Sequence, residues 1–507
     1  MNPSSSTMDS DDAITILDQL LAVMSPHEQE AVAATADHVL SLCGNAKSID
    51  QFKLMVAYGG GKDSTYTVAF MRAVQLSIAV RQGRTFILRV ANMRHGGVTR
   101  AVSMNIHHVY QRLGLLDDSR TELITVDHDQ IATFDVNRPL PQRMLDINRQ
   151  DILMNGHLSG GDGRPTFCNS CNFSVASFYG QACWWDGGVD VVVTGDSSKE
   201  QKHYYTWIIR LAQQLGIDPT VHRQQGFHGL LAIINRIAHQ YYSSLYGAEN
   251  DKALALRDIH AGSVQRIPHF MSIYDAVSYR VDDHWKLVVD FLGFEFDEMA
   301  FSFTESDCFN PALMAHLRGL KVEYVHQGDY LTGIREYLQL ADKLMRKKEI
   351  PQVLIDLAMS RYTTAEDVQR MHDKATEYAA EVFALSQDQL ICLVFSPFIG
   401  QGKRLRPFID QLHPQRASQI KTILALLDAN TTVDDGNADT DGLVSWLQEI
   451  SGLSLKLLRR LYASPDIDFG HTNSMISLLR QNDPHKAAVD TVDPDNGRPI
   501  KQWLSGR

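Results

Sequence analysis

The chain has 507 residues, of which 44% are hydrophobic and 21% are charged, and its formal net charge is -12. These values are typical of a globular protein with a large core, and the negative balance disfavours nucleic acid as a partner, since nucleic acid needs a basic surface. Six cysteines in so long a chain exclude a disulfide-based scaffold, and no apolar stretch approaches the length of a membrane span. We therefore expect a cytoplasmic protein that does not enter a membrane.

The first 48 residues are expected to form a polar tail and a helical cap. Apolar residues recur at helical spacing over 11–43, and the stretch Ser25-Pro26-His27 interrupts them. A break of this kind between two amphipathic segments predicts a helical hairpin.

Residues 49–215 are expected to form an α/β domain. Short apolar runs alternate there with longer helical segments, and this order predicts a parallel sheet with helices on both faces. The expected strands are 53–58, 85–92, 122–127 and 189–195, and the expected helices are 63–77, 100–114, 169–185 and 203–216. Two intervening stretches are expected to be irregular: the polar segment 127–146 and the glycine-rich segment 158–167.

The second half of the chain is expected to be largely helical. Residues 216–427 carry several amphipathic stretches and no catalytic motif, so we assign them to substrate recognition. The acidic, glycine-containing segment 428–442 is expected to be a linker. Residues 443–507 are expected to form a C-terminal helical region.

One short stretch has the composition of a phosphate site. Tyr58-Gly59-Gly60-Gly61-Lys62-Asp63-Ser64-Thr65 lies between an expected strand and an expected helix. A loop in this place offers free backbone N–H groups and the positive end of the helix dipole, and both attract phosphate. A kinase-type loop is excluded, because Asp63 follows Lys62 where that loop needs serine or threonine. A dinucleotide-binding loop is excluded, because Ser64 replaces its third glycine.

The same stretch resembles the PP-loop of ATP pyrophosphatases, whose pattern is Ser-Gly-Gly-x-Asp-Ser. The match is at Gly60, Gly61, Asp63 and Ser64, and Gly59 stands where the family usually has serine. The resemblance implies a parallel PP-loop (HUP-like) core that binds ATP with Mg²⁺ and splits it between the α and β phosphates. AMP would then be transferred to a substrate oxygen, and pyrophosphate would be released.

The resemblance also assigns roles to individual residues. Lys62, Asp63 and Lys199 are expected to be catalytic, with Lys199 beside the phosphates. The nucleotide-binding residues are expected to be Gly59, Gly60, Gly61, Asp63, Ser64 and Thr65 for the pyrophosphate, Val90 to Asn92 for the adenine, and Gly195 and Asp196 beside the phosphates.

Two cysteines, Cys168 and Cys171, begin the expected helix 169–185 with Cys-x-x-Cys spacing. Two thiolates at a helix N-terminus suit metal ligation, a redox pair or a persulfide relay. Their place before a strand and a Thr-Gly loop resembles the tRNA sulfurtransferases that make 2-thiouridine and 2-thiocytidine, with Asp196 in place of a histidine. This resemblance implies a [4Fe-4S] cluster with Cys308 as third ligand, or alternatively Zn²⁺. The other three cysteines are expected to be buried packing residues: Cys43, Cys183 and Cys392.

The function favoured by these motifs is adenylation of an acceptor followed by sulfur transfer. One alternative is amide formation, since N-acetyl sugar amidotransferases carry a similar loop; ammonia would then come from a partner protein. Another alternative is a non-catalytic nucleotide-binding protein. The sequence leaves open whether the acceptor is a small molecule or a macromolecule, whether a sulfur or ammonia donor protein takes part, and whether the chain forms a homodimer.

Overall fold

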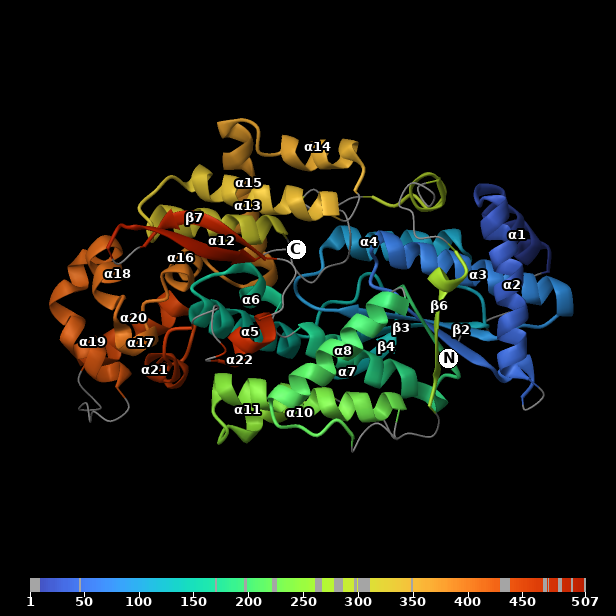
Figure 1. The fold of residues 1–507 in the computed structure, drawn as a ribbon, viewed down its shortest axis with the longest axis horizontal. Coiled ribbons are helices and arrows are strands. Elements are labelled where there is room, and N and C mark those ends of the chain that lie inside the picture. Colours follow the sequence, from blue (N-terminus) through green and yellow to red (C-terminus); the bar gives the residue numbers. More distant parts are fainter. Residues whose placement is uncertain are drawn as a thin grey trace.

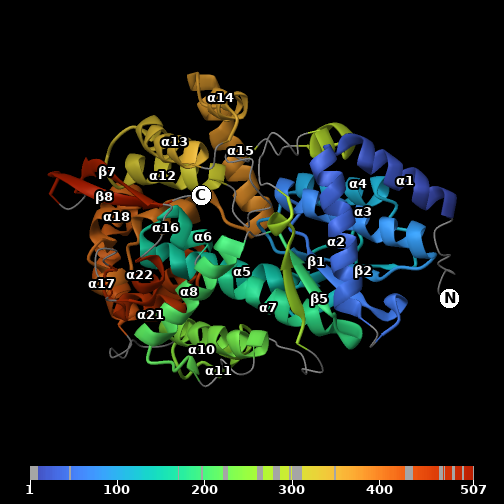
Figure 2. The same cartoon turned by 45° about the vertical axis from the view of Figure 1, so that its right-hand side comes forward.

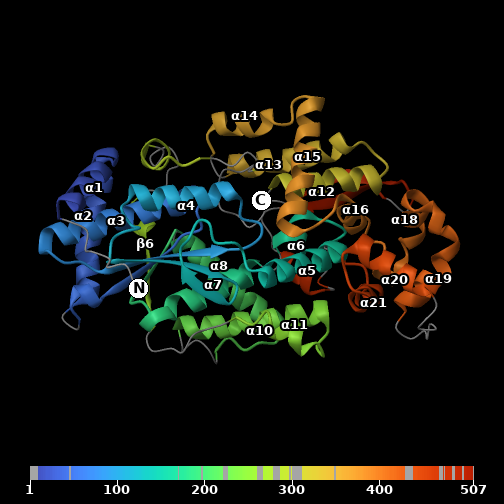
Figure 3. The same cartoon turned by 180° about the vertical axis from the view of Figure 1, so that it is seen from behind.

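The protein has an α/β part and a helical part, which lie side by side (Figures 1 and 3). The computed structural model describes residues 10–44, 47–168, 171–195, 198–220, 226–259, 267–277, 286–295, 299, 311–347, 350–428, 438–467, 472, 474–481, 486–493 and 496–505. The α/β part is at the right of Figure 1 and holds the N-terminal helices and the larger sheet. Helices of the C-terminal half fill the left of that view.

A six-stranded, mostly parallel sheet organises the α/β part. Its strands stand in the order β4-β3-β2-β1-β5-β6, and only β4 runs antiparallel to its neighbour. The strands are β1 (Lys53–Ala57), β2 (Ile87–Arg94), β3 (Thr121–Asp127), β4 (Gln130–Thr133), β5 (Val191–Thr194) and β6 (His269–Ser272). The predicted α/β class with a parallel central sheet is therefore confirmed.

Helices cover both faces of this sheet, which is why its central strands are apolar at successive positions. Leu54 and Val56 of β1 point to one face, where they pack with residues of α3 (Lys62–Gln82) and α4 (Arg100–Arg112). Met55 points to the other face, where it packs with Phe178 and Ala182 of α7 (Cys171–Trp184). Alternate side chains of one strand thus belong to two separate cores.

Two N-terminal helices cover α3. The predicted pair of helices with a break at Ser25 is present as α1 (Ser10–Val23) and α2 (Pro26–Cys43), and each of them packs on α3. Ser25 caps α2, because its side chain accepts from the Glu28 N–H and the Glu28 carboxylate accepts from the Ser25 N–H. The Tyr66 hydroxyl of α3 donates to Glu28 at 2.7 Å and ties the cap to the sheet layer.

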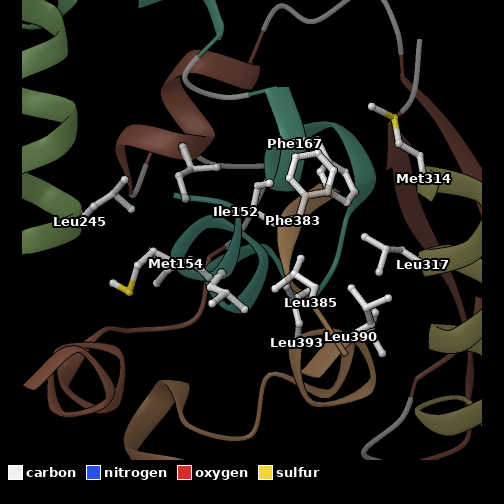
Figure 4. Packing of buried hydrophobic residues seen from close by; sticks show 14 of the residues in the cluster. Ile152, Met154, Phe167, Leu245, Met314, Leu317, Phe383, Leu385, Leu390 and Leu393 are labelled. Atoms are coloured by element: carbon white, nitrogen blue, oxygen red, sulfur yellow. The ribbon is translucent and has the colours of Figure 1, made fainter. Parts of the chain in front are cut away.

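The helical part is built around α5 (Gln142–Ser159), which contacts three helices from the C-terminal half: α15 (Ala365–Phe383), α16 (Gln387–Phe395) and α21 (Leu455–Ala463). Leucine, isoleucine and phenylalanine side chains from these helices form one continuous core (Figure 4). The remaining helices are α6 (Gly163–Cys168), α8 (Ser198–Gln214), α10 (Gly226–Tyr246), α11 (Asp251–Ala255), α12 (Pro311–Tyr324), α13 (Tyr330–Lys347), α14 (Gln352–Ser360), α17 (Ile399–Gly402), α18 (Leu405–Leu412), α19 (Ile420–Leu427), α20 (Ala438–Ser451) and α22 (Met475–Arg480).

No single helix among the described residues is both long and apolar enough to cross a membrane. Helices α15 and α16 pass that test only when taken together, and the chain bends by 95° between them.

The predictions differ from the structure around α5 and α6. The segment 127–146, expected to be irregular, contains β4 and the start of α5. The segment 158–167, expected to be a glycine-rich loop, is mostly helical, because α5 ends at Ser159 and α6 begins at Gly163. Two glycines with positive φ, Gly160 at 59° and Gly161 at 72°, make the short turn between the two helices.

The later part of the chain also differs from its largely helical prediction. β6 comes from the segment expected to be helical, and it completes the larger sheet beside β5. α20 begins at Ala438, inside the predicted linker, whose residues 429–437 lie outside the described part. After α22, the chain forms an antiparallel hairpin of β7 (Lys486–Val492) and β8 (Pro499–Ser505). Ser505 binds the Asp162 carboxylate through its N–H at 3.1 Å and its hydroxyl at 2.8 Å.

Candidate functional site

The glycine loop lies at the point where the order of the sheet reverses. β1, β2 and β3 follow one another outward in one direction, whereas β5 pairs with the opposite edge of β1. The chain segments that leave the carboxyl ends of β1 and β5 therefore diverge to opposite faces of the sheet. In open α/β sheets, the crevice between two such segments is the usual place for a ligand.

The loop itself requires glycine for two separate reasons. Gly60 has a φ of 81°, which other residues rarely adopt. In addition, a Cβ atom on Gly60 would lie 2.6 Å from Cγ1 of Val102 and 2.9 Å from Cδ1 of Ile106. Both partners belong to the first two turns of α4, so the loop is packed tightly against that helix. Gly61 then forms the N-cap of α3, and it supplies no side chain to cap the helix.

A buried hydrogen-bond chain fixes the entrance to the loop. The Tyr58 N–H donates to the Ala91 carbonyl at 2.9 Å, and the Asn92 side chain donates to the Tyr58 carbonyl at 2.7 Å. The Tyr110 hydroxyl donates to Oδ1 of Asn92 at 2.6 Å, and the hydroxyls of Tyr58 and Thr65 lie 3.0 Å apart. Asn92 and Thr65 were expected to contact the nucleotide. In the structure both are buried, and their side chains hold the loop in place.

The first turn of α3 places the polar residues of the motif together. The Lys62 side chain, which is only 4% exposed, forms an ion pair with the Asp63 carboxylate. The Ser64 hydroxyl donates to the Gly61 carbonyl at 3.0 Å. Asp63 is partly buried, and it occupies the end of the helix where the dipole favours a negative group. Gly59, the departure from the PP-loop pattern, is exposed at the start of this loop.

The end of β5 reaches the same helix turn. A Cβ atom on Gly195 would lie 3.5 Å from Oγ1 of Thr67 and 3.9 Å from Cα of Ser64, so the two backbones approach closely. Asp196 lies outside the described residues. Lys199 is in the first turn of α8, and its side chain is not among those described. The sequence did not single out Gln201, whose side chain donates to Oγ1 of Thr194 at 2.9 Å.

The end of β2 borders the loop from the other side. Val90 lies inside the sheet, paired with Val56 of β1 and Leu123 of β3. The last pair between β1 and β2 is Ala57 with Ala91, whereas β2 continues to Arg94. The edge of β2 from Asn92 onward thus extends past β1, beside the glycine loop.

The cysteine motif joins two helices near this edge. Cys168 is the last residue of α6 and Cys171 is the first of α7; their side chains are not described. The ring of Phe167 lies 5.9 Å from the ring of Phe383, centroid to centroid (Figure 4). Phe383 in turn contacts the loop after β2, because a Cβ atom on Gly96 would lie 3.4 Å from its Cε1 atom. Phe383 thus connects the end of α6 to the segment that follows β2.

The three cysteines expected to bind a metal are not all within the described residues. Within the described residues, no group of three histidine, cysteine, aspartate or glutamate side chains is placed to hold a metal. Cys308 lies outside those residues. The expected packing cysteines, Cys43, Cys183 and Cys392, are buried and free, so that prediction is confirmed. Burial raises the pKa of Cys183 to about 12, which keeps this thiol protonated and unreactive.

No protein-family model, curated protein or solved structure matches the chain.

Proposed function

We propose that the chain binds ATP at the glycine loop and transfers AMP to an acceptor oxygen, with release of pyrophosphate. The observation that carries this proposal is the position of the Gly60 turn at the reversal point of the sheet. The turn leads directly into an uncapped helix N-terminus, and the backbone at Gly195 approaches that helix from the neighbouring strand. Backbone N–H groups of such a turn suit the oxygens of a pyrophosphate.

The charges near the loop fit a leaving pyrophosphate. Lys62 supplies a cation at the helix N-terminus, and Asp63 supplies a carboxylate for Mg²⁺, which neutralises phosphate charge when bound. Adenine is assigned to the end of β2 beyond Ala91, which extends past β1. In the proposed arrangement, the pyrophosphate lies over the loop and the α phosphate lies toward Gly195. This is the arrangement expected of a PP-loop core.

The proposal is tested without knowledge of the acceptor by competition binding. A fluorescent ATP analogue should bind the purified chain in the presence of Mg²⁺, and free pyrophosphate should displace it far more effectively than AMP. A kinase-type site would instead favour ADP over pyrophosphate. If neither ATP nor pyrophosphate binds, the proposed site is refuted.

We propose sulfur transfer as the second step, because the motif Cys168-Asn169-Ser170-Cys171 spans the α6–α7 junction. The preceding residue, Phe167, is linked through Phe383 to the segment after β2. Cys168 and Cys171, with Cys308, are the residues proposed to hold a [4Fe-4S] cluster, which supplies sulfur chemistry when bound. Zn²⁺ is the alternative occupant.

Metal analysis of anaerobically purified protein tests this second step. We expect about four iron atoms per chain, lost in Cys168→Ala and retained in the matched control Cys183→Ala, whose thiol is buried in the sheet layer. A colourless protein that contains zinc, or no metal, would refute the cluster. If ATP and pyrophosphate still bind, that result favours the amidotransferase alternative with ammonia from a partner.

A further inference from the structure

The loop that joins β2 to α4 is held by a helix from a distant part of the chain. The Tyr378 hydroxyl of α15 donates to the Gly97 carbonyl at 2.8 Å, although 281 residues separate the two positions. One residue earlier, a Cβ atom on Gly96 would lie 3.4 Å from the Val382 carbonyl and from the Phe383 ring. The C-terminal end of α15 thus packs directly on this loop, and α15 lies between the helical part and the α/β part (Figure 2).

This loop contains two adjacent glycines, Gly96 and Gly97, and glycine restricts the backbone least. Two hydrogen bonds within the loop involve His95: the Gly97 N–H donates to its Nδ1 atom at 3.1 Å, and the Val98 N–H donates to its carbonyl at 3.1 Å. The tie to Tyr378 comes from outside the loop and fixes it relative to the helical part.

The position of this loop matters because it continues the end of β2 that extends past β1. This end begins at Asn92 and passes through Arg94, which forms a two-point ion pair with Asp127. The next residues form the loop, and α4 follows it. α4 contacts Gly60 through Val102 and Ile106, whereas Tyr378 binds the loop at Gly97. Loss of the Tyr378 hydrogen bond is therefore expected to displace the loop on the adenine side and to leave the contacts of α4 with Gly60 in place.

We propose that Tyr378 is a positioning residue for the nucleotide site, acting through the Gly97 carbonyl on the adenine side. The inference rests on the proposed function, because it assumes that ATP occupies the glycine loop. It adds that the helical part takes part in forming the nucleotide site, in addition to the acceptor recognition assigned to it from the sequence.

The test uses the full chain with Tyr378→Phe, which keeps the ring and removes the hydrogen bond to Gly97. The matched control is Tyr337→Phe on α13, whose buried hydroxyl donates to Sδ of Met314 at 3.4 Å. Dissociation constants are measured separately for Mg-ATP and for Mg-pyrophosphate. We expect Tyr378→Phe to weaken ATP binding roughly two- to tenfold, the range of one neutral hydrogen bond, and to leave pyrophosphate binding unchanged.

The split between the two ligands separates positioning from a general loss of structure. Equal weakening of ATP and pyrophosphate, or an ATP affinity equal to that of the unaltered chain, would overturn the role of Tyr378. The same holds if Tyr337→Phe shows the same selective loss. If the unaltered chain binds neither ligand, the proposed function itself fails, and the inference fails with it.

Discussion

The Gly60 turn allows the sharpest prediction. Gly60→Ala places a methyl group 2.6 Å from Cγ1 of Val102, on a backbone with a φ of 81°. A non-glycine residue in this region costs about 1–2 kcal/mol, and inserting a methyl group into a packed contact costs about 1–3 kcal/mol more. We expect the free energy of unfolding to fall by about 2–5 kcal/mol in total, because either the loop or α4 must move.

Gly83→Ala is the matched control, since Gly83 ends the same helix and also has a positive φ, of 69°. A Cβ atom on Gly83 would meet nothing within 4 Å, so only the backbone term of about 1–2 kcal/mol applies. Urea unfolding measures both costs, and titration with ATP measures binding.

Displacement of the loop removes one charged hydrogen bond to phosphate, which contributes about 1.5–3 kcal/mol. ATP should therefore bind about 10- to 100-fold more weakly to Gly60→Ala, and with unchanged affinity to Gly83→Ala. The reasoning is wrong if the two variants bind ATP equally well.

Two further predictions concern stability. Arg72 and Asp118 form a completely buried ion pair with a separation of 2.9 Å. Asp118→Ala should lower the free energy of unfolding by about 3–5 kcal/mol, because it leaves the buried Arg72 charge without this partner. Adding Arg72→Met removes that charge and should recover part of the loss. If urea unfolding shows that the losses of the two substitutions simply add, this reasoning is wrong. Burial lowers the pKa of His157 to about 4, so its neutral form is favoured in the folded chain. The contribution of neutral His157 to the free energy of unfolding is complete above pH 6.5. It is lost as the pH falls toward 4, at about 1.4 kcal/mol per pH unit. His157→Gln should therefore reduce the pH dependence of the free energy of unfolding between pH 6 and 5 by that amount, and an unchanged pH dependence would show that His157 titrates normally.

The sequence predicted the centre of the sheet well because its signals are local. β1, β2 and β3 are short apolar runs, and each is followed by a segment with a turn or helix-start signal. The glycine turn was also predictable, since its residues are consecutive and need no information from elsewhere in the chain. Even α3, whose middle turns are buried on all sides under α1 and α2, was predicted as a helix from its place after the loop.

The remaining elements were missed for physical reasons. β4 is a short antiparallel edge strand with partly exposed, polar residues, so it lacks the apolar run of a central strand. β6 is equally short and pairs with a strand far back in the chain. The bond between Tyr378 and Gly97 joins residues 281 positions apart, and no local pattern reports such a contact.

The bond between Ser505 and Asp162 has a consequence for how the protein is made. The two residues are 343 positions apart, and Asp162 directly precedes α6, which carries Cys168 at its other end. At about 5–20 residues per second, a ribosome needs roughly 20 to 70 seconds to make the intervening chain. During that interval the start of α6 lacks its final anchor, so we expect this helix to reach its finished environment only after the last residues of β8 have been made.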